Sequence, residues 1–434
     1  MLTEQIYKEF LSSSGICTDT RQEVGGKLFF ALKGDQFDGN RFVEDALDKG
    51  CRLAITERKD LKGMKAVAVV PSALKLLQDL AHYHRIQVAP RLVAITGSNG
   101  KTTTKELMAA VLSSEHDLIA TKGNLNNHIG VPLTLLTLNR QKLAVIEMGA
   151  NHPGEIAELA RIAAPDVGLI TNVGKAHLEG FGSVQGVLNA KGELYAYLAA
   201  HGGKAIVDGG DQVLMDLAEK LGVERLDLAP EGELQVRVNL LRQSPFLEVE
   251  LIMGEECFPL TTKLVGAYNI QNILLAAGTG LHFGIPPAGI AAAIAGYRPE
   301  NQRSQMIKGE RNILVMDSYN ANPSSMREAI GSIMNYASSP IMLILGDMAE
   351  LGSSSEQEHS DLLRWIATLD VDRVLLAGPR FHRVCEPAAH ISVFKDRSEL
   401  EAMLEKEMPE GYHILLKGSR VMELEQLSYL LIDS

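Results

Sequence analysis

The stretch AITGSNGKTTTKE, residues 94–106, decides the fold of the region around it. Its Gly100, Lys101 and Thr102 are typical of the end of a phosphate-binding loop, G-x-x-x-x-G-K-[ST]. That pattern expects its first glycine at position 95, where the chain has Ile95, and the nearest glycine is Gly97. The stretch is therefore either a nucleotide site with a shortened loop or an ordinary turn that contains Lys and Thr.

The residues on both sides of the loop predict a strand followed by a helix. RLVAIT (91–96) is a short apolar run, and KTTTKELMAAVLSS (101–114) carries apolar residues at helical spacing. In that context glycines let the backbone approach an anion, and the N–H groups that begin a helix point toward it. Lys101 can neutralise phosphate charge, and the Thr102 hydroxyl can coordinate Mg²⁺. We therefore interpret the stretch as a phosphate-binding loop.

Composition indicates a soluble enzyme of more than one domain. The chain has 434 residues, of which 46% are hydrophobic and 22% charged, and this length suits two or three domains. Its formal net charge of −12 argues against broad nucleic-acid binding, which needs a basic face. We expect no membrane span and no secretory signal, because no apolar run is long enough. Four cysteines without a C-x-x-C pair fit reduced thiols, so a cytoplasmic location is expected.

The order of the patterns predicts three α/β domains. Residues 1–87 indicate a small mixed α/β domain. Residues 88–304 alternate β-rich runs with helices, which predicts a parallel sheet, and alternation over 234–263 predicts antiparallel strands added to it. Residues 305–434 begin a second, Rossmann-like α/β series, in which GSSSEQE (352–358) predicts a short polar loop.

The loop T-G-S-N-G-K-T-T resembles that of the Mur ligases and folylpolyglutamate synthases, which carry T-G-[ST]-N-G-K-T-T. TDTR (18–21) with LFFALKGDQFDG (28–39) is similar to the UDP-sugar domain of the Mur ligases. The ordered set of motifs is more specific than any one of them. The resemblance extends over nearly the whole chain through GNLNNHIGVPLTLL (123–136), EMGANHPGEI (147–156), TNVGKAHLEGFGS (171–183), AKGEL (190–194), DSYNANPSSM (317–326), LGDMAELG (345–352) and KGSR (417–420).

This resemblance implies ATP-dependent formation of an amide bond. The C-terminal motifs imply UDP-MurNAc-tripeptide as the acyl donor and D-alanyl-D-alanine as the incoming amine. A carboxylate is a poor acyl donor, so ATP phosphorylates it, the amine attacks the acyl phosphate, and the tetrahedral intermediate expels phosphate. Such a reaction needs positioning and charge neutralisation rather than a covalent nucleophile.

The resemblance also implies a set of catalytic and metal-binding residues. By position alone, Glu147 could equally be a capping or surface acid, a lone His177 is more often structural, and Lys191 on a helix is more often solvated. The matching family lysine is carbamylated by CO₂, so we expect the same of Lys191. The implied catalytic residues are Lys101, Glu147, His177 and Lys191, and the implied ligands of two Mg²⁺ ions are Thr102, Glu147, His177 and Lys191.

Further residues are implied to bind the nucleotide. Asn269 and Asn272 lie at an i, i+3 spacing on one helix face, where helix capping is the alternative role. Gln302 replaces the usual family glycine before Arg303, so Arg298 is the fallback for the γ-phosphate contact. The implied set is Gly97, Ser98, Asn99, Gly100, Lys101, Thr102, Thr103, Asn269, Arg303 and Asp317. These residues come from two expected domains, so we expect the site to form when the domains close.

For the other substrates, the resemblance aligns Thr20 and Arg21 with the contact to uridine diphosphate. It aligns Asn126 and Asn127 with the muramoyl or peptide portion, although His128 stands where this group often has an acid. Candidates for the carboxylate of the dipeptide, for which a strand-end turn is the alternative, are Lys417, Ser419 and Arg420.

Other interpretations share the loop. A regulatory ATPase would need neither TDTR, nor DSYNANP, nor the implied metal ligands. A folylpolyglutamate synthase lacks the first domain, and the ligase that adds the third peptide residue would carry a D-N-P-R-like signature that we do not find. Dependence of ATP turnover on an amine separates a ligase from a switch. A monomer is usual for enzymes of this design and is expected here.

Overall fold

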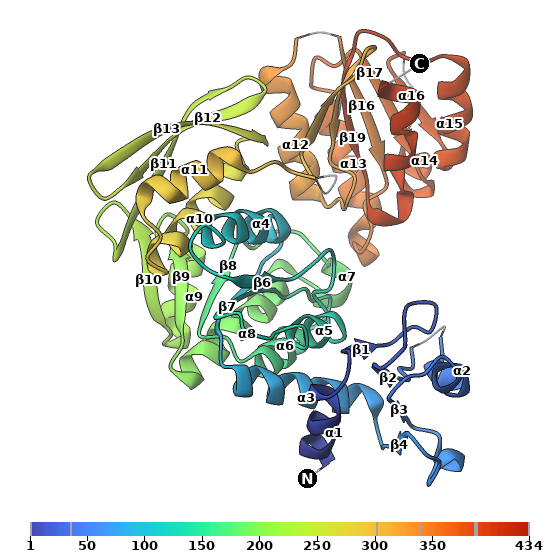
Figure 1. Ribbon diagram of the computed structural model, residues 1–434. Coiled ribbons are helices and arrows are strands. Elements are labelled where there is room, and N and C mark those ends of the chain that lie inside the picture. The colour runs from blue at the N-terminus through green and yellow to red at the C-terminus, as the bar shows by residue number, and fades with distance from the viewer. Residues whose placement is uncertain (1, 35–36, 301–302, 339, 386–388, 433–434) are drawn as a thin grey trace.

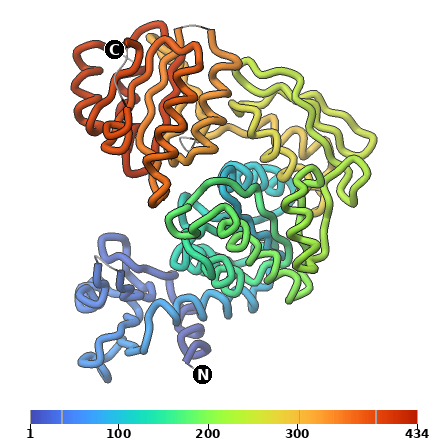
Figure 2. Tube along the Cα trace, turned by 180° about the vertical axis from the view of Figure 1, so that it is seen from behind, coloured from blue at the N-terminus to red at the C-terminus, as the bar shows by residue number. Residues whose placement is uncertain are grey.

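The computed structural model describes residues 2–34, 37–300, 303–338, 340–385 and 389–432, and it contains three sheets. Each sheet belongs to a separate α/β domain, and the three domains form an arc with the central domain in the middle (Figures 1 and 2). The α/β class and the three-domain architecture expected from the sequence are therefore confirmed. The limits after residues 87 and 304 stay predictions.

The N-terminal domain is a four-stranded parallel sheet in the order β1-β2-β3-β4. Helix α3 runs beneath the central domain and packs against α5 and α6 of that domain (Figure 1). Its buried face joins one continuous core with both domains, in which Phe30, Leu77 and Leu135 take part. The elements are α1 (Leu2–Leu11), β1 (Ile16–Cys17), β2 (Leu28–Phe30), the 3₁₀ turn η1 (Gly39–Phe42), α2 (Val43–Asp48), β3 (Leu53–Thr56), η2 (Lys59–Leu61), β4 (Val67–Val69) and α3 (Ala73–Val88).

The central domain is built on nine strands in the order β13-β12-β11-β10-β9-β8-β5-β7-β6. Strands β5 to β10 are parallel, and β11, β12 and β13 pair antiparallel, as the alternation over 234–263 predicts. The elements are β5 (Arg91–Thr96), α4 (Lys101–Leu112), β6 (Leu118–Ala120), α5 (Gly130–Leu135), β7 (Leu143–Glu147), α6 (Glu155–Ala163), β8 (Val167–Ile170), α7 (Leu178–Phe181), α8 (Val184–His201), β9 (Lys204–Asp208), α9 (Gln212–Leu221), β10 (Glu224–Ala229), β11 (Leu234–Gln243), β12 (Phe246–Met253), β13 (Glu256–Val265), α10 (Asn269–His282) and α11 (Pro287–Gly296).

The C-terminal domain is a six-stranded sheet in the order β14-β15-β19-β16-β17-β18, parallel except for β14. Separate apolar clusters cover its two faces. The elements are β14 (Gln305–Lys308), β15 (Ile313–Met316), α12 (Pro323–Tyr336), β16 (Ile341–Gly346), η3 (Gly352–Ser354), α13 (Ser355–Ile366), β17 (Arg373–Ala377), α14 (Pro379–Val384), β18 (Ile391–Phe394), α15 (Arg397–Lys406), β19 (His413–Lys417), η4 (Arg420–Met422), η5 (Leu424–Leu427) and α16 (Ser428–Ile432).

The expected polar loop at residues 352–358 is wrong in its second half. Helix α13 already begins at Ser355, with Glu356 and Glu358 in its first turn, where acidic side chains favour a helix start. The polar composition of this stretch reflects a solvated helix end rather than a loop.

Among the residues that the structure describes, none of the helices combines the length and the apolar character that crossing a membrane requires.

Candidate active site

Strand register places the candidate residues of the central domain at one edge of its sheet. Strand β5 lies between β7 and β8, and Ile95 is paired with Glu147 at the end of β7. Thr96 is paired with Ile170 at the end of β8. The loop after β5, Glu147 and the segment that leads to His177 therefore leave the sheet side by side, where ligands of open α/β sheets bind.

Two glycines of the shortened loop occupy positions that no other residue fits. Gly97 has φ +142°, and a Cβ there would lie 1.9 Å from Thr171 Oγ1. Gly100 has φ +77°, and its Cβ would lie 2.4 Å from Asn272 Oδ1. The loop thus passes close to the segment after β8 and to α10. The missing glycine at position 95 is explained because Ile95 is still a fully buried residue of β5.

Lys101 is the first residue of α4, and its side chain folds back over the loop. Its Nζ donates to Gly97 O at 2.7 Å and to Ser98 O at 3.2 Å. Burial lowers the pKa of the ammonium, while the charge of Glu147 acts in the opposite direction. The lysine is therefore held beside the loop, within reach of an anion bound there.

Glu147 is buried and is held by two side chains of the site. Its Oε2 accepts from Thr102 Oγ1 at 2.9 Å, and its Oε1 accepts from Asn126 Nδ2 at 2.8 Å. Lys105 Nζ lies 3.9 Å from the same Oε2. The contacts argue against the surface or capping role that position alone left open, because the carboxylate faces the loop rather than solvent.

Asn269 and Asn272 are buried and connect α10 to the loop helix. Asn272 Oδ1 accepts from Thr104 Oγ1 at 2.9 Å, and its Nδ2 donates to Asn269 Oδ1 at 2.8 Å. Asn269 Nδ2 in turn donates to Val265 O at 2.8 Å. These bonds explain the i, i+3 pair as a support for the phosphate loop, and an additional contact of Asn269 with adenine stays a prediction.

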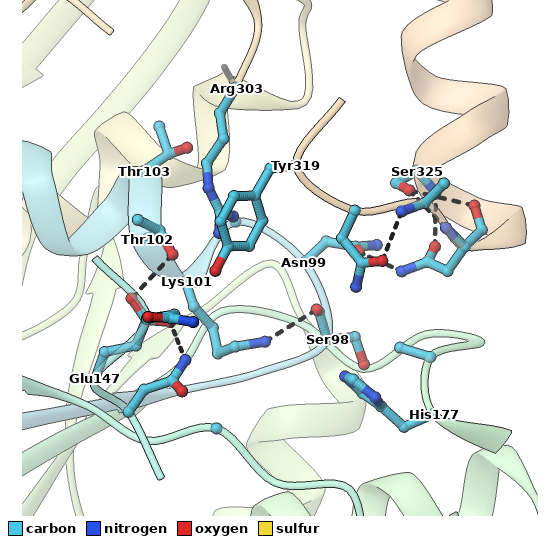
Figure 3. Close-up of a pocket in the computed structure, with 18 of the residues that line it drawn as sticks. Ser98, Asn99, Lys101, Thr102, Thr103, Glu147, His177, Arg303, Tyr319 and Ser325 are labelled. Atoms are coloured by element: carbon cyan, nitrogen blue, oxygen red, sulfur yellow. Dashed lines mark hydrogen bonds between the residues drawn. The ribbon is translucent and has the colours of Figure 1, made fainter. Parts of the chain in front are cut away.

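A polar cavity of about 460 Å³ lies between the central and C-terminal domains. Figure 3 shows Thr102 and Glu147 on the left of it, Ser325 on the right, and Arg303 and Tyr319 above Lys101 between them. The structure therefore brings together candidates that are more than 200 positions apart in the chain. The expected residues that line the cavity are Ser98, Asn99, Gly100, Lys101, Thr102, Thr103, Asn126, Asn127, Glu147, His177, Asn269, Arg303, Asp317 and Lys417.

Arg303 enters the cavity from the link between the central and C-terminal domains. The centre of its guanidinium lies 3.7 Å from the centroid of the Tyr319 ring, and that of Arg420 lies 5.8 Å from the same ring. Arg303 Nε is buried and has no hydrogen-bond partner among the described residues. A buried unpaired donor is costly, so this position suits an anionic ligand. Gln302, which precedes Arg303, lies outside the described residues, and the fallback Arg298 does not line the cavity.

The buried Lys417 and the partly buried Asp317 form an ion pair at the ends of β19 and β15. Lys417 Nζ lies 2.5 Å from Asp317 Oδ2 and also donates to Asn320 O at 3.2 Å. Removal of one partner from a buried pair costs about 3–5 kcal/mol, because the other charge is left unpaired. Lys417 therefore fixes the loop that carries Asp317, and its expected contact with the dipeptide carboxylate stays a prediction.

His177 and Lys191 differ in their relation to the cavity. His177 lines it and contacts Glu350 of the C-terminal domain, with Nδ1 2.5 Å from Oε2. Lys191 is fully buried on α8 and is not a lining residue; its Nζ donates to Ala150 O at 3.4 Å and lies 5.1 Å from the centroid of the Phe181 ring. Burial lowers the pKa of Lys191 to about 7. The solvated lysine that position alone favoured is excluded.

Several expected substrate residues lie outside the cavity. Thr20 is buried in the N-terminal domain, and the exposed Arg21 side chain pairs with Asp19 at 2.7 Å. Ser419 is buried, and its N–H donates to Asp347 O at 3.0 Å, while Arg420 pairs with Glu425 at 2.9 Å. A ligand that touches both Arg21 and the cavity must extend from one domain to the other.

Asn127 and His128 also make hydrogen bonds within the protein. Asn127 Oδ1 accepts from the N–H groups of Ile129 and Gly130, at 3.1 and 2.9 Å, and so caps the start of α5. His128 is exposed at the cavity, where its carbonyl accepts from Gln78 Nε2 at 3.3 Å.

Sequence reasoning missed several lining residues of the C-terminal domain and of the link to it. Tyr319 and Asn322 belong to DSYNANPSSM and Glu350 to LGDMAELG, so the motifs contained the signal, although only Asp317 was assigned. Tyr268 and Ser304, whose hydroxyls lie 2.5 Å apart, are the neighbours of the assigned Asn269 and Arg303 but were not assigned themselves.

Within the described ranges, no three His, Cys, Asp or Glu side chains are grouped closely enough to hold a metal ion by themselves. Mg²⁺ in phosphate-transferring sites is usually bound by one or two protein side chains, water and the phosphates of the substrate. Thr102 and Glu147, whose oxygens are 2.9 Å apart beside the loop, fit that kind of site.

A phosphate loop that faces a second α/β domain across a polar cavity is the arrangement of an enzyme that uses a nucleoside triphosphate and closes around it. Sequence comparison gives the particular family. The profile "Mur ligase family, catalytic domain" matches residues 13–95, "Mur ligase middle domain" matches 95–280, and "Mur ligase, glutamate ligase domain" matches 302–420. The chain belongs to the Mur ligase family.

Individual relatives agree over the full length. The UDP-N-acetylmuramoyl-tripeptide--D-alanyl-D-alanine ligase of Bacillus subtilis is 33% identical over 97% of this chain and 93% of its own length. The crystal structure of MurF from Acinetobacter baumannii is 31% identical and superposes with a TM-score of 0.87, over 98% of this chain and 97% of its own. MurF ligase from Thermotoga maritima in complex with ADP, 25% identical, gives a TM-score of 0.85 over 97% of both chains.

Proposed function

We propose that this chain joins D-alanyl-D-alanine to the peptide carboxylate of UDP-MurNAc-tripeptide, with conversion of ATP to ADP and phosphate. The observation that carries the proposal is the match over 97% of the chain to a ligase named for this reaction. The cavity supports it, because its lining combines a phosphate loop with residues of the C-terminal domain. A regulatory ATPase would need no such second domain against the loop.

The residues of the cavity supply positioning and charge neutralisation. The loop N–H groups and Lys101 hold the phosphates of ATP, and Arg303 offers its unpaired Nε to the phosphoryl group being transferred. The tripeptide carboxylate attacks that group and becomes an acyl phosphate, and ADP departs. The amine of the dipeptide then attacks the acyl carbon, and the tetrahedral intermediate expels phosphate as the amide forms.

Thr102 and Glu147 are the residues that would hold a first Mg²⁺, and His177 and Lys191 are those expected for a second. Mg²⁺ neutralises phosphate charge when it is bound. The convergence of Thr102 Oγ1 and Glu147 Oε2 supports the first set.

Lys191 is expected to react with CO₂, and its surroundings favour that reaction. Only the neutral amine is nucleophilic, and burial lowers the pKa of Lys191 to about 7, so much of it is neutral near that pH. The nitrogen attacks the carbon of CO₂ and releases a proton, which gives a carbamate in place of a cation. A carbamate would supply oxygens for a cation at this buried position. Restoration of turnover in Lys191→Ala by short carboxylic acids supports this, and full activity of that variant without them contradicts it.

The substrate contacts proposed from the resemblance are spread over three domains. Thr20 and Arg21 would contact the uridine diphosphate in the N-terminal domain. Asn126 and Asn127 would contact the muramoyl or peptide portion in the cavity, and Lys417, Ser419 and Arg420 would face the dipeptide. A long substrate, with a nucleotide at one end and a peptide at the other, suits this spread.

The experiment that tests the function is phosphate release from MgATP with UDP-MurNAc-tripeptide, D-alanyl-D-alanine, both, or neither. Release that requires both, with a product whose mass increases by the dipeptide residue, supports the ligase. Phosphate release that is independent of both substrates contradicts the ligase and favours a regulatory ATPase.

We also propose a cytoplasmic monomer. Cys17, Cys51 and Cys257 are free thiols, which suits a reducing compartment, and ATP is supplied there. Light scattering of the purified chain tests the monomer, which a stable dimer mass would contradict.

A further inference from the structure

The contact between His177 and Glu350 joins two domains at the edge of the cavity. His177 Nδ1 is buried and lies 2.5 Å from Glu350 Oε2, an ion-pair contact in which the ring N–H is not aligned for a hydrogen bond. The backbone repeats the connection, because Glu179 N donates to Glu350 O at 3.1 Å. One residue of the C-terminal domain therefore holds the segment 177–179 by its side chain and by its carbonyl.

Both residues of this contact have a left-handed backbone. His177 has φ +52° and Glu350 has φ +61°. Among the described residues, seven non-glycine residues have positive φ, and only His177, Ser304 and Glu350 of these line the cavity. Such strain persists where the surroundings impose it and concentrates at functional sites. Its occurrence on both sides of one contact indicates that the contact is built rather than accidental.

The loop that carries Glu350 is anchored firmly within its own domain. Met348 N donates to the buried His359 Nε2 at 3.1 Å, and Arg380 donates from its guanidinium to Met348 O. Asp347 accepts from the N–H groups of Arg380 and Phe381, both at 2.9 Å, at the start of α14. Glu350 is thus presented by a rigid loop, and its position reports the position of the whole C-terminal domain.

We propose that Glu350 is a positioning residue that fixes the ring of His177 across the domain interface. With Nδ1 in contact with the carboxylate, Nε2 is the ring nitrogen left for a ligand. A carboxylate beside a histidine restrains its tautomer and its orientation. Because the two residues belong to different domains, His177 adopts this orientation only when the C-terminal domain is seated. This rests on the proposed function in so far as His177 serves the ligase reaction.

The interface offers a matched control. Glu358 Oε1 accepts from Lys175 Nζ at 2.6 Å across the same two domains, two residues from His177, yet neither side chain lines the cavity. Glu350→Gln and Glu358→Gln each remove one carboxylate charge and preserve side-chain size. If the contacts only hold the domains together, the two variants should behave alike.

The test combines kinetics with nitrogen-15 NMR of the histidine rings. We expect Glu350→Gln to lower kcat about 10- to 100-fold with little change in the KM for UDP-MurNAc-tripeptide, whereas Glu358→Gln stays near wild type. The ring signals of His177, assigned with His177→Gln, should change tautomer pattern only in Glu350→Gln. Equal effects of both variants, or unchanged His177 signals in Glu350→Gln, would overturn the proposal. The NMR comparison is made with a non-hydrolysable ATP analogue and UDP-MurNAc-tripeptide, which should seat the C-terminal domain. It needs no turnover, so it remains decisive even if the wild-type protein fails as a ligase.

Discussion

At the scale of single residues, two constraints require glycine at position 100: a left-handed backbone and the close approach of the Asn272 side chain. Comparison with Gly202 separates their effects. Gly100 and Gly202 have similar backbones, with φ +77° and +71°, but only Gly100 faces another group, Asn272 Oδ1. Alanine at either position should cost about 1–2 kcal/mol of unfolding free energy from left-handed strain. Gly100→Ala should also displace Asn272 and weaken ATP binding. Urea unfolding and calorimetric ATP titration check this, and equal results for both variants would contradict it.

Lys417 distinguishes a structural role from a role in binding. If its main partner is Asp317, Lys417→Met removes the cation from a partly buried carboxylate and should reduce the unfolding free energy by about 1–3 kcal/mol. The loss is smaller than for a fully buried pair, because Ser304 N still donates to Asp317 Oδ1. Adding Asp317→Asn to that variant should restore part of the loss. If Lys417 serves only the dipeptide carboxylate, Lys417→Met should instead raise the KM for D-alanyl-D-alanine without a change in stability. Denaturant unfolding of the single and double variants measures the difference.

The sequence predicts these residues to different extents, for a physical reason. The loop from Gly97 to Thr103 is recognisable because its glycines, lysine and hydroxyls act through local backbone geometry. Lys417 meets Asp317 100 positions away, and Asn272 meets Thr104 168 positions away. Spacing along the chain carries no information about such partners, so the residue types were identified while their contacts were not.

At the scale of elements, Asn322 both caps the start of helix α12 and bonds to the phosphate loop. The Asn322 side chain accepts from Ser325 N at 2.9 Å in a capping box, and its Nδ2 donates to Asn99 Oδ1 at 2.7 Å. Asn322→Ala should lose about 1 kcal/mol of stability and also weaken ATP binding. Asn322→Ser retains a cap but is too short to reach Asn99.

Thermal unfolding and the KM for ATP therefore separate the two functions of Asn322. The serine variant should unfold near the wild-type temperature and still show a raised KM. If serine restores both quantities, the bond to Asn99 has no part in nucleotide binding.

Helix α13 contributes a buried histidine whose protonation should destabilise its domain. His359 Nδ1 faces Ser355 O at 2.7 Å and Nε2 accepts from Met348 N, so the ring is neutral, and Asp347, Arg380 and Glu358 are the nearby charged groups. Burial lowers the pKa of His359 below 6.5 in the folded state. The unfolded state then binds more protons below pH 6.5, so stability is lost as pH falls, by at most about 1.4 kcal/mol per pH unit.

Urea unfolding between pH 5 and pH 7.5 measures that dependence. His359→Gln should have a flatter profile than wild type over this range, because one titrating group is gone. The exposed His201→Gln, a substitution on the surface of α8, should keep the wild-type slope. A wild-type slope in His359→Gln would assign the acid sensitivity to other groups.

The elements themselves were predictable where a pattern repeats along the chain. Alternation over 234–263 identified β11 to β13, because their inner faces are apolar and their outer faces polar. The loop prediction for 352–358 was wrong in its second half, because the serines and glutamates that begin a helix are the same residue types that are common in loops. The polar composition of this stretch indicates only exposure to solvent, and a helix start and a loop are both exposed.

At the scale of the whole molecule, the distribution of cores indicates which domain moves. The N-terminal and central domains share one apolar cluster, which includes Ile55, Leu80 and Ile162, whereas the C-terminal sheet has clusters of its own. The N-terminal and C-terminal domains lie at opposite ends of the arc (Figure 2). Closure on ligand should therefore be a motion of the C-terminal domain about the link near Ser304, a residue with φ +51°. Sequence could predict the need for closure but not its axis, since the shared core depends on tertiary packing.

Small-angle scattering with and without ligands tests this motion. The radius of gyration should fall when a non-hydrolysable ATP analogue and UDP-MurNAc-tripeptide are both present. Distances between paired fluorophores should shorten between the central and C-terminal domains and stay constant between the N-terminal and central domains, because a continuous core resists relative movement. Glu358→Gln provides the control for the interface, since loss of the single ion pair between Glu358 and the exposed Lys175 should leave the closed state accessible. Scattering profiles that do not change with both ligands would contradict closure, and a shortening confined to the N-terminal pair would place the hinge at α3 instead.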